Sequence, residues 1–271
     1  MPDMQRPTLG SASFGLVMGT LAGAALLLLA APTLVVLVTS FTDGYSLKFP
    51  PPSYSLRWYA SLIDAWQLQD AALVSLKLGA VVTAVSAVLG TAAALAIGRS
   101  RRAWARGLDA LFMSPLVLPA LAFGLASLVF FSTAGVELSF LTLAIGHIVV
   151  SVPYVLRTTL ASLAQLDPAL LESSESLGAG RLYTFRRVTL PTIRNGIGAG
   201  AFIAFMSSFD NIPVSLFMAD ARNEVLPIRM WQILENSLDV RAAAVSGVLI
   251  AVTVLAMVVM ERVAGLSRQL R

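Results

Sequence analysis

The chain has 271 residues, of which 57% are hydrophobic and 13% are charged, and its mean hydropathy is +0.79. Soluble domains carry about 25% charged residues, so this composition excludes an ordinary soluble domain and indicates a protein that crosses a lipid bilayer several times. The net charge of +4 does not indicate nucleic acid, because in a membrane protein the distribution of Lys and Arg matters more than their sum. The chain has no Cys and one His, which excludes thiolate and His-rich metal sites, so we expect no metal and no cofactor.

Six apolar segments follow one another along the chain, and each is long enough to cross a bilayer as a helix. They cover residues 14–41, 71–97, 108–131, 140–156, 197–218 and 242–260. The first is too long for the apolar part of a signal peptide, so we take it as an uncleaved helix. Pro115 and Pro119 predict a kink in the third. We predict an all-α membrane protein with one transmembrane domain over residues 1–271.

An even number of spans places both termini on the same side of the membrane. If that side is the cytoplasm, it collects an excess of Lys and Arg of about two to one, as the positive-inside rule requires. The arginines assigned to it are Arg6, Arg99, Arg101, Arg102, Arg106, Arg157, Arg181, Arg186, Arg187, Arg194, Arg262, Arg268 and Arg271. We therefore predict that both termini are cytoplasmic.

The longest polar interruption, residues 158–196, lies between the fourth and fifth spans. Asp167 is placed to cap a short helix, and Gly178 is placed to end it, because only glycine adopts a left-handed cap freely. A second short helix, about residues 181–188, is expected to stop before Pro191. Two short helices joined at a glycine predict a docking element on the cytoplasmic side.

This segment resembles the Glu-Ala-Ala loop of the inner-membrane permease subunits of binding-protein-dependent ABC importers. That loop has Glu-Ala-Ala, three residues, Gly, nine residues, an aliphatic residue, one residue and then Leu-Pro. The same spacing is found here in Glu172, Ser173, Ser174, Gly178, Val188, Leu190 and Pro191, with serine in place of both alanines. The runs at residues 49–51, 55–59 and 208–210 are similar to those of putrescine/spermidine-type permeases in particular.

The resemblance implies the type I ABC importer permease fold and a transport subunit in the inner membrane of a bacterium. It also implies partners: a second permease subunit, identical or different, two cytoplasmic ATPase subunits and an extracytoplasmic solute-binding protein. The residues implied to couple to the ATPase are Glu172, Ser173, Ser174, Leu177, Gly178, Leu190 and Pro191. The alternative for this segment is an amphipathic connector that lies in the membrane interface.

ATP hydrolysis is not expected in this chain. Its only lysines, Lys48 and Lys77, do not follow a glycine-rich loop, so the phosphate-binding motif of ATPases is absent from the sequence. The chain is therefore predicted to be a non-enzymatic subunit, with the nucleotide hydrolysed by a partner.

The fifth span contains an acid, and ionisable groups inside a bilayer usually have a function. Asp210 precedes Pro213, which is expected to break the local helix. A carboxylate beside aromatic rings suits an organic cation. Together with this, the resemblance to putrescine/spermidine-type permeases implies that the solute is a polyamine or a related cationic amine. The predicted substrate pathway consists of Ser207, Ser208, Phe209, Asp210 and Asn211. The alternative is that Asp210 caps the broken helix or pairs with a residue such as Lys77.

Two further polar groups lie in apolar segments. His147 is predicted to be buried and hydrogen-bonded to a neighbouring helix, and Asp109 is predicted to be favoured by the dipole at a helix N-terminus. Two alternative functions stay open: an importer permease for another small solute, such as an amino-acid-like compound, iron or thiamine, and a stand-alone secondary transporter. Flux through the isolated chain would favour the second.

Overall fold

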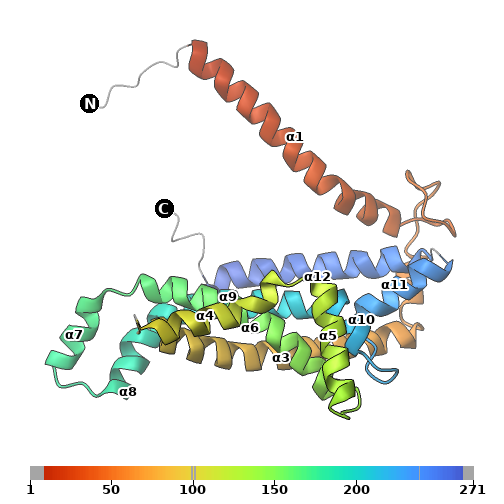
Figure 1. Cartoon of the computed structure of the whole chain (residues 1–271). Helices are drawn as coiled ribbons and strands as arrows, with labels where there is room; N and C mark the ends of the chain where they lie inside the picture. Colours follow the sequence, from red (N-terminus) through yellow and green to blue (C-terminus); the bar gives the residue numbers. More distant parts are fainter. Residues whose placement is uncertain (1–8, 99, 101, 238, 265–271) are drawn as a thin grey trace. The chain divides into compact units, whose positions relative to one another are not determined.

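The computed structural model describes residues 9–98, 100, 102–237 and 239–264 (Figure 1). Within these residues the regular secondary structure is helical and contains no strand, so the predicted all-α class is confirmed. The predicted cytoplasmic termini, residues 1–8 and 265–271, lie outside the described residues. So do five arginines of the predicted topology: Arg6, Arg99, Arg101, Arg268 and Arg271.

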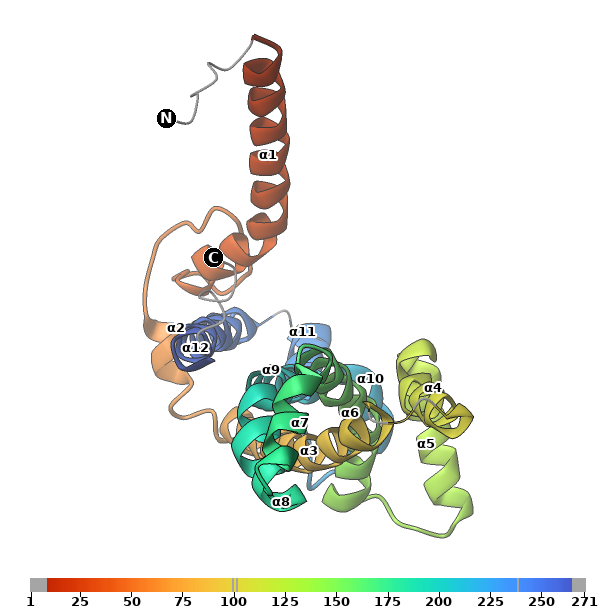
Figure 2. The same cartoon turned by 90° about the vertical axis from the view of Figure 1, so that its left-hand side faces the viewer.

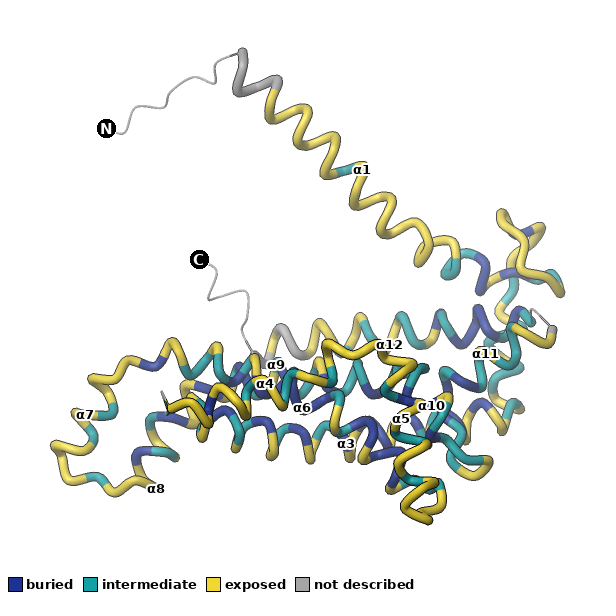
Figure 3. Tube along the Cα trace, in the orientation of Figure 1, coloured by how far each residue is buried: buried dark blue, intermediate teal, exposed yellow. Residues whose placement is uncertain are grey.

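The chain divides into two compact units, Met1–Ala65 with Ile233–Val259 and Trp66–Gln232 with Met260–Arg271. In the first unit, α1 (Leu9–Ser40) is followed by a loop and the short helix α2 (Arg57–Ser61), and most of α12 (Arg241–Ala264) also belongs to this unit. The apolar part of α1 buries almost none of its surface within the chain (Figure 3). Its exposed apolar side chains therefore require contact with lipid or with another protein.

The second unit is built on three long helices that pack side by side (Figures 1 and 2). They are α3 (Trp66–Gly98), α6 (Phe140–Ala164) and α9 (Leu190–Phe209). Glycines allow these helices to approach closely. A Cβ atom on Gly200 would lie 2.6 Å from the Cα atom of Val155 on α6, so no larger residue fits there without a backbone shift.

The aliphatic core of this unit continues to the end of the bundle opposite the α6–α9 connection. Its buried members are Leu78, Val82, Leu143, Ala144, Val214, Met218, Val225 and Ile228. The backbone N–H of Leu226, the first residue of α11 (Leu226–Ser237), donates to the Ser75 hydroxyl at 2.8 Å and joins this helix to α3.

Two spans are broken. Helices α4 (Ala103–Val117) and α5 (Ala120–Thr133) meet at 104°, and α9 meets α10 (Ile212–Met218) at 53°. The kink predicted in the third segment is therefore confirmed. By length and composition four described helices can cross a membrane alone, and the count reaches the predicted six if each bent pair forms one span.

The prediction that Pro191 ends the second short helix is wrong. Helix α8 (Arg181–Thr184) continues through a π-helical turn, Phe185–Thr189, directly into α9. In that turn the N–H of Leu190 donates to the carbonyl five residues back, and Pro191 follows directly without ending the helix. The helix that contains the predicted fifth span therefore starts before residue 197. Helix α6 likewise extends eight residues beyond the predicted 156.

Candidate functional site

The connection between α6 and α9 is a helical hairpin made of α7 (Pro168–Ser176) and α8, and it lies at one end of the three-helix bundle (Figure 1). As predicted, the Asp167 carboxylate caps α7, and Gly178 adopts a left-handed conformation with φ +76°. The N–H of Gly178 donates to the Glu175 carbonyl, and the N–H of Ala179 donates to the Ser174 carbonyl. These two bonds form a Schellman motif, which fixes the direction in which the chain leaves α7.

A hydroxyl pair joins the two arms of the α7–α8 hairpin. The Oγ atom of Ser174 lies 2.8 Å from the Oγ1 atom of Thr184, and Thr184 is buried. No residue of α7 is itself buried, so this bond contributes to holding α7 in place where apolar packing is scarce. One of the two serines that depart from the Glu-Ala-Ala pattern therefore has an intramolecular partner.

The outer face of the hairpin is exposed and partly apolar (Figure 3). Leu177 is the most exposed of its leucines, with 88% of its surface accessible. The other large apolar residues exposed there are Leu170, Leu182 and Tyr183, and the exposed charged residues are Glu172, Glu175, Arg181, Arg186 and Arg187. Exposed leucines and charges of both signs on a projecting hairpin form a surface suited to another protein.

The break between α9 and α10 places Asp210 between the two helices. Asn211 caps α10 by accepting a hydrogen bond from the N–H of Val214 at 3.0 Å, so Asp210 does not cap this helix. The Asp210 side chain is exposed, and within the described part of the chain it has neither a hydrogen bond nor an ion pair, including with Lys77. Neither structural alternative for Asp210 is observed.

The predicted pathway residues around Asp210 differ in exposure. The rings of Phe205 and Phe209 stack with centroids 6.0 Å apart and planes at 25°. Ser207 and Asn211 are half-buried, whereas Ser208 is buried and its hydroxyl lies 3.0 Å from the Nδ1 atom of His147. The prediction that His147 is buried and bonded to a neighbouring helix is thus confirmed, and the Ser208 hydroxyl points into the core.

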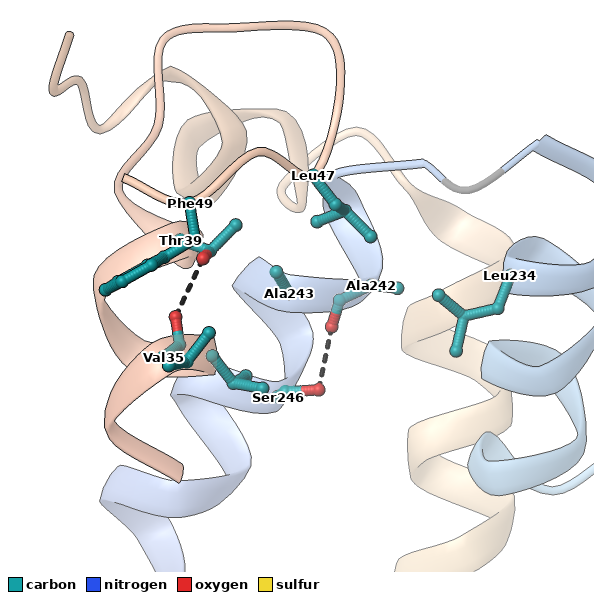
Figure 4. Close-up of a pocket in the computed structure, with 9 residues that line it drawn as sticks. Val35, Thr39, Leu47, Phe49, Leu234, Ala242, Ala243 and Ser246 are labelled. Atoms are coloured by element: carbon teal, nitrogen blue, oxygen red, sulfur yellow. Dashed lines mark hydrogen bonds between the residues drawn. The ribbon is translucent and has the colours of Figure 1, made fainter. Parts of the chain in front are cut away.

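A separate pocket of about 260 Å³ lies within the first unit (Figure 4). Its lining residues are Val35, Val36, Thr39, Leu47, Phe49, Leu234, Ala242, Ala243 and Ser246. The hydroxyls of Thr39 and Ser246 donate to carbonyls of their own helices at 2.7 and 2.9 Å. Because none of these described lining residues is charged, the pocket offers a charged ligand no ion-pair partner.

Residues 86–268 match the family described as the binding-protein-dependent transport system inner membrane component, and this match covers more than half of the chain. The chain belongs to this family. It is therefore a permease subunit of the bacterial inner membrane, in agreement with its apolar helices and with the prediction from the sequence.

Curated relatives include two permeases that are named for their substrates. This chain is 25% identical over 232 residues to the spermidine/putrescine transport system permease protein PotC of Haemophilus influenzae. The aligned residues cover 85% of this chain and 89% of the relative. It is 28% identical over 208 residues to the putrescine transport system permease protein PotI of Escherichia coli, covering 74% of each chain.

Solved structures show the same fold at lower identity. A bacterial alginate ABC transporter in complex with an alginate-bound periplasmic protein matches with a TM-score of 0.69 and 16% identity, covering 96% of each chain. An amino acid ABC transporter matches with a TM-score of 0.56 and 16% identity, covering 79% of this chain and 98% of that one. The predicted ABC importer permease fold is thus confirmed.

The sequence did not predict the partner of Asp109 in the permease. Asp109 lies in the second turn of α4 rather than at its N-terminus, so the dipole argument for it is wrong. Its Oδ2 atom lies 3.2 Å from an Nη2 atom of Arg157, whose Nε donates to the Met113 sulfur at 3.0 Å. The sequence shows opposite charges in neighbouring spans, an acid on α4 and an arginine on α6. It does not show which faces of these helices meet, so the ion pair could not be predicted.

Proposed function

We propose that this permease forms the translocation pathway for a polyamine or a related cationic amine delivered by an extracytoplasmic solute-binding protein. The observation that carries the proposal is the carboxylate of Asp210 at the break in the fifth span, which is exposed and has no partner among the described residues. The substrates for which the relatives PotC and PotI are named support the same solute class.

A carboxylate that faces lipid is costly, whereas one that faces a water-filled pathway is hydrated and can bind a cation. Asp210 has no internal cation within the described residues, so a solute ammonium group would supply the missing charge. Phe209 precedes it and stacks on Phe205, and aromatic faces add cation–π attraction for an amine. Ser207 and Asn211 add hydrogen-bonding groups beside the carboxylate. Ser208 is left out of this pathway because its hydroxyl is engaged in the core.

We further propose that the α7–α8 hairpin docks on a cytoplasmic ATPase subunit. The exposed leucines would enter a groove of that subunit, and Glu172 and Glu175 would meet its cations. The complete transporter would contain this permease, a second permease chain and two ATPases, with one hairpin on each ATPase. ATP-driven closure of the ATPases would then move the hairpins and change the side on which the pathway is open.

The test of the solute site is Asp210→Asn in the assembled transporter, with uptake of radiolabelled spermidine and putrescine measured in proteoliposomes. Loss of one charged contact is worth about 1.5–3 kcal/mol, so KM is expected to rise about 10- to 100-fold. Asp210→Glu keeps the charge and should retain most of the uptake.

The matched control is Asp220→Asn. Asp220 accepts a hydrogen bond from the Asn223 amide in the loop after α10, outside the apolar segments. This variant should transport with an unchanged KM. If Asp210→Asn transports both amines with wild-type kinetics, Asp210 is not part of the solute pathway.

A further inference from the structure

A buried histidine connects three helices at the break in the fifth span. His147 on α6 is 0% exposed. Its Nδ1 atom lies 3.0 Å from the Ser208 hydroxyl on α9, and its Nε2 atom lies 3.1 Å from the Ser215 hydroxyl on α10. Ser208 precedes Asp210 along the chain and Ser215 follows it. One imidazole ring therefore bridges both arms of the bent span.

We propose that His147 is a positioning residue that sets the bend between α9 and α10 and thereby places Asp210. The first half of this proposal depends only on the contacts of the ring. The second half rests on the proposed function, because it assumes that Asp210 meets the solute.

The backbone alone holds this bend weakly. At the break the N–H of Asn211 reaches the Ser208 carbonyl only at 3.5 Å, at the long limit of a hydrogen bond, and the N–H of Ile212 donates to the Asp210 carbonyl at 3.0 Å, which closes a turn of only three residues. Helix α10 has seven residues, which is too short to be stable without tertiary contacts. The direction of α10 must therefore be set by the side chains that pack against it.

Two glycines, one on α6 and one on α5, allow α10 to pack closely against these helices. A Cβ atom on Gly146, the residue before His147, would lie 3.1 Å from a methyl group of Val214. On α5, a Cβ atom on Gly124 would lie 2.5 Å from the carbonyl oxygen of Pro213. Helix α10 is thus held between α5 and α6, and the bonds of His147 fix its rotation there.

The chemistry of the ring favours positioning over simple filling of space. A neutral imidazole has one donor and one acceptor nitrogen, and serine hydroxyls can serve either. An aliphatic residue of similar size would fill the core without the cost of burying two polar nitrogens. If the ring is lost, each serine can turn to a carbonyl of its own helix, as Ser127 does toward Phe123 at 2.9 Å. Removal of His147 should therefore release the bend while the protein still folds.

The chain contains no cysteine, so two spin labels can be attached at introduced cysteines without a background signal from this chain, and the assembly that carries no introduced cysteine measures any signal from the partner subunits. Suitable positions are the exposed residues Ile203 on α9 and Leu216 on α10. In the assembled transporter, His147→Leu is expected to shift or broaden the distance distribution between these labels. His147→Gln, whose amide keeps one donor and one acceptor, should restore part of the narrow distribution, and Ser127→Ala should leave it unchanged.

Transport kinetics give a second readout. His147→Leu should raise KM for amine uptake about two- to tenfold, the range for losing one or two neutral hydrogen bonds, while the ATPase subunits still co-purify.

Ser208→Ala and Ser215→Ala serve as substitutes if His147→Leu fails to insert, and each should broaden the distances less. A distance distribution between the labels that is identical to wild type in His147→Leu, Ser208→Ala and Ser215→Ala would overturn the proposal. If the distances change but Asp210→Asn transports normally, His147 sets the bend and the solute role of Asp210 is wrong.

Discussion

The hydroxyl of Ser174 occupies a position where the Glu-Ala-Ala pattern has a methyl group, and it bonds Thr184 across the hairpin. A neutral hydrogen bond contributes about 0.5–1.5 kcal/mol. Ser174→Ala and Thr184→Val are therefore each expected to weaken binding of the ATPase subunit by at most about tenfold. The double variant should be no worse than either single one, because both remove the same bond. Titration of the ATPase subunit onto the permease in lipid nanodiscs measures this.

Ser176→Ala is the matched control for that prediction. The Ser176 hydroxyl lies on the same helix but donates to the Glu172 carbonyl at 2.9 Å, within α7 itself. Its removal should leave the affinity for the ATPase unchanged. Equal effects of Ser174→Ala and Ser176→Ala would show that the bond between the two arms has no role in docking.

The sequence was sufficient for residues whose conformation is local. Asp167 and Gly178 were predicted as helix caps because a cap needs only its own neighbours along the chain. The bonds of His147 to Ser208 and Ser215 join residues 61 and 68 positions apart. Those partners depend on the rotation of three helices about their axes, which hydrophobic pattern alone does not determine.

At the scale of elements, the close contact of α6 and α9 depends on the absence of a side chain at Gly200. A methyl group there would meet the backbone of α6 at 2.6 Å, and overpacking costs about 1–3 kcal/mol. Gly200→Ala is therefore expected to lower the unfolding temperature of the purified permease in detergent. The measurement is thermal unfolding followed by intrinsic fluorescence.

Gly198→Ala, two residues earlier on the same helix, is the control. A Cβ atom at Gly198 would meet no atom of the chain within 4 Å, and alanine favours a helix over glycine by about 0.5–1 kcal/mol. This variant should therefore unfold at the same or a higher temperature. A stable Gly200→Ala protein would mean that α6 and α9 do not approach as closely as described.

The existence of the spans was predictable from apolar runs, but some of their ends were not. Arg157 and Arg194 interrupt the apolar pattern, and the predicted spans stopped near them, yet α6 and α9 continue through both positions. A helix ends where its hydrogen bonds end, and charged residues are good helix formers. Pro119 correctly predicted a kink, whereas the π-helical turn that carries the chain past Pro191 has no sequence signal of comparable strength.

At the scale of the whole molecule, the described part of the permease chain leaves two apolar surfaces exposed. The apolar part of α1 is almost entirely exposed, and so are the leucines of the α7–α8 hairpin. Lipid can cover the first, but the mixed apolar and charged surface of the second suits a protein. Composition could predict that the chain crosses the membrane. Composition could not identify the molecule that covers each surface, because partner proteins have sequences of their own.

The most direct test of the account is uptake of radiolabelled spermidine by proteoliposomes that contain either this permease alone or the full assembly. The full assembly has the second permease chain, the ATPase subunits and the binding protein. We expect saturable, ATP-dependent uptake by the full assembly, its loss in Glu172→Lys, and no uptake by the permease alone with ATP or an imposed ion gradient. Saturable uptake by the permease alone, driven by an ion gradient, would contradict the account and indicate a secondary transporter.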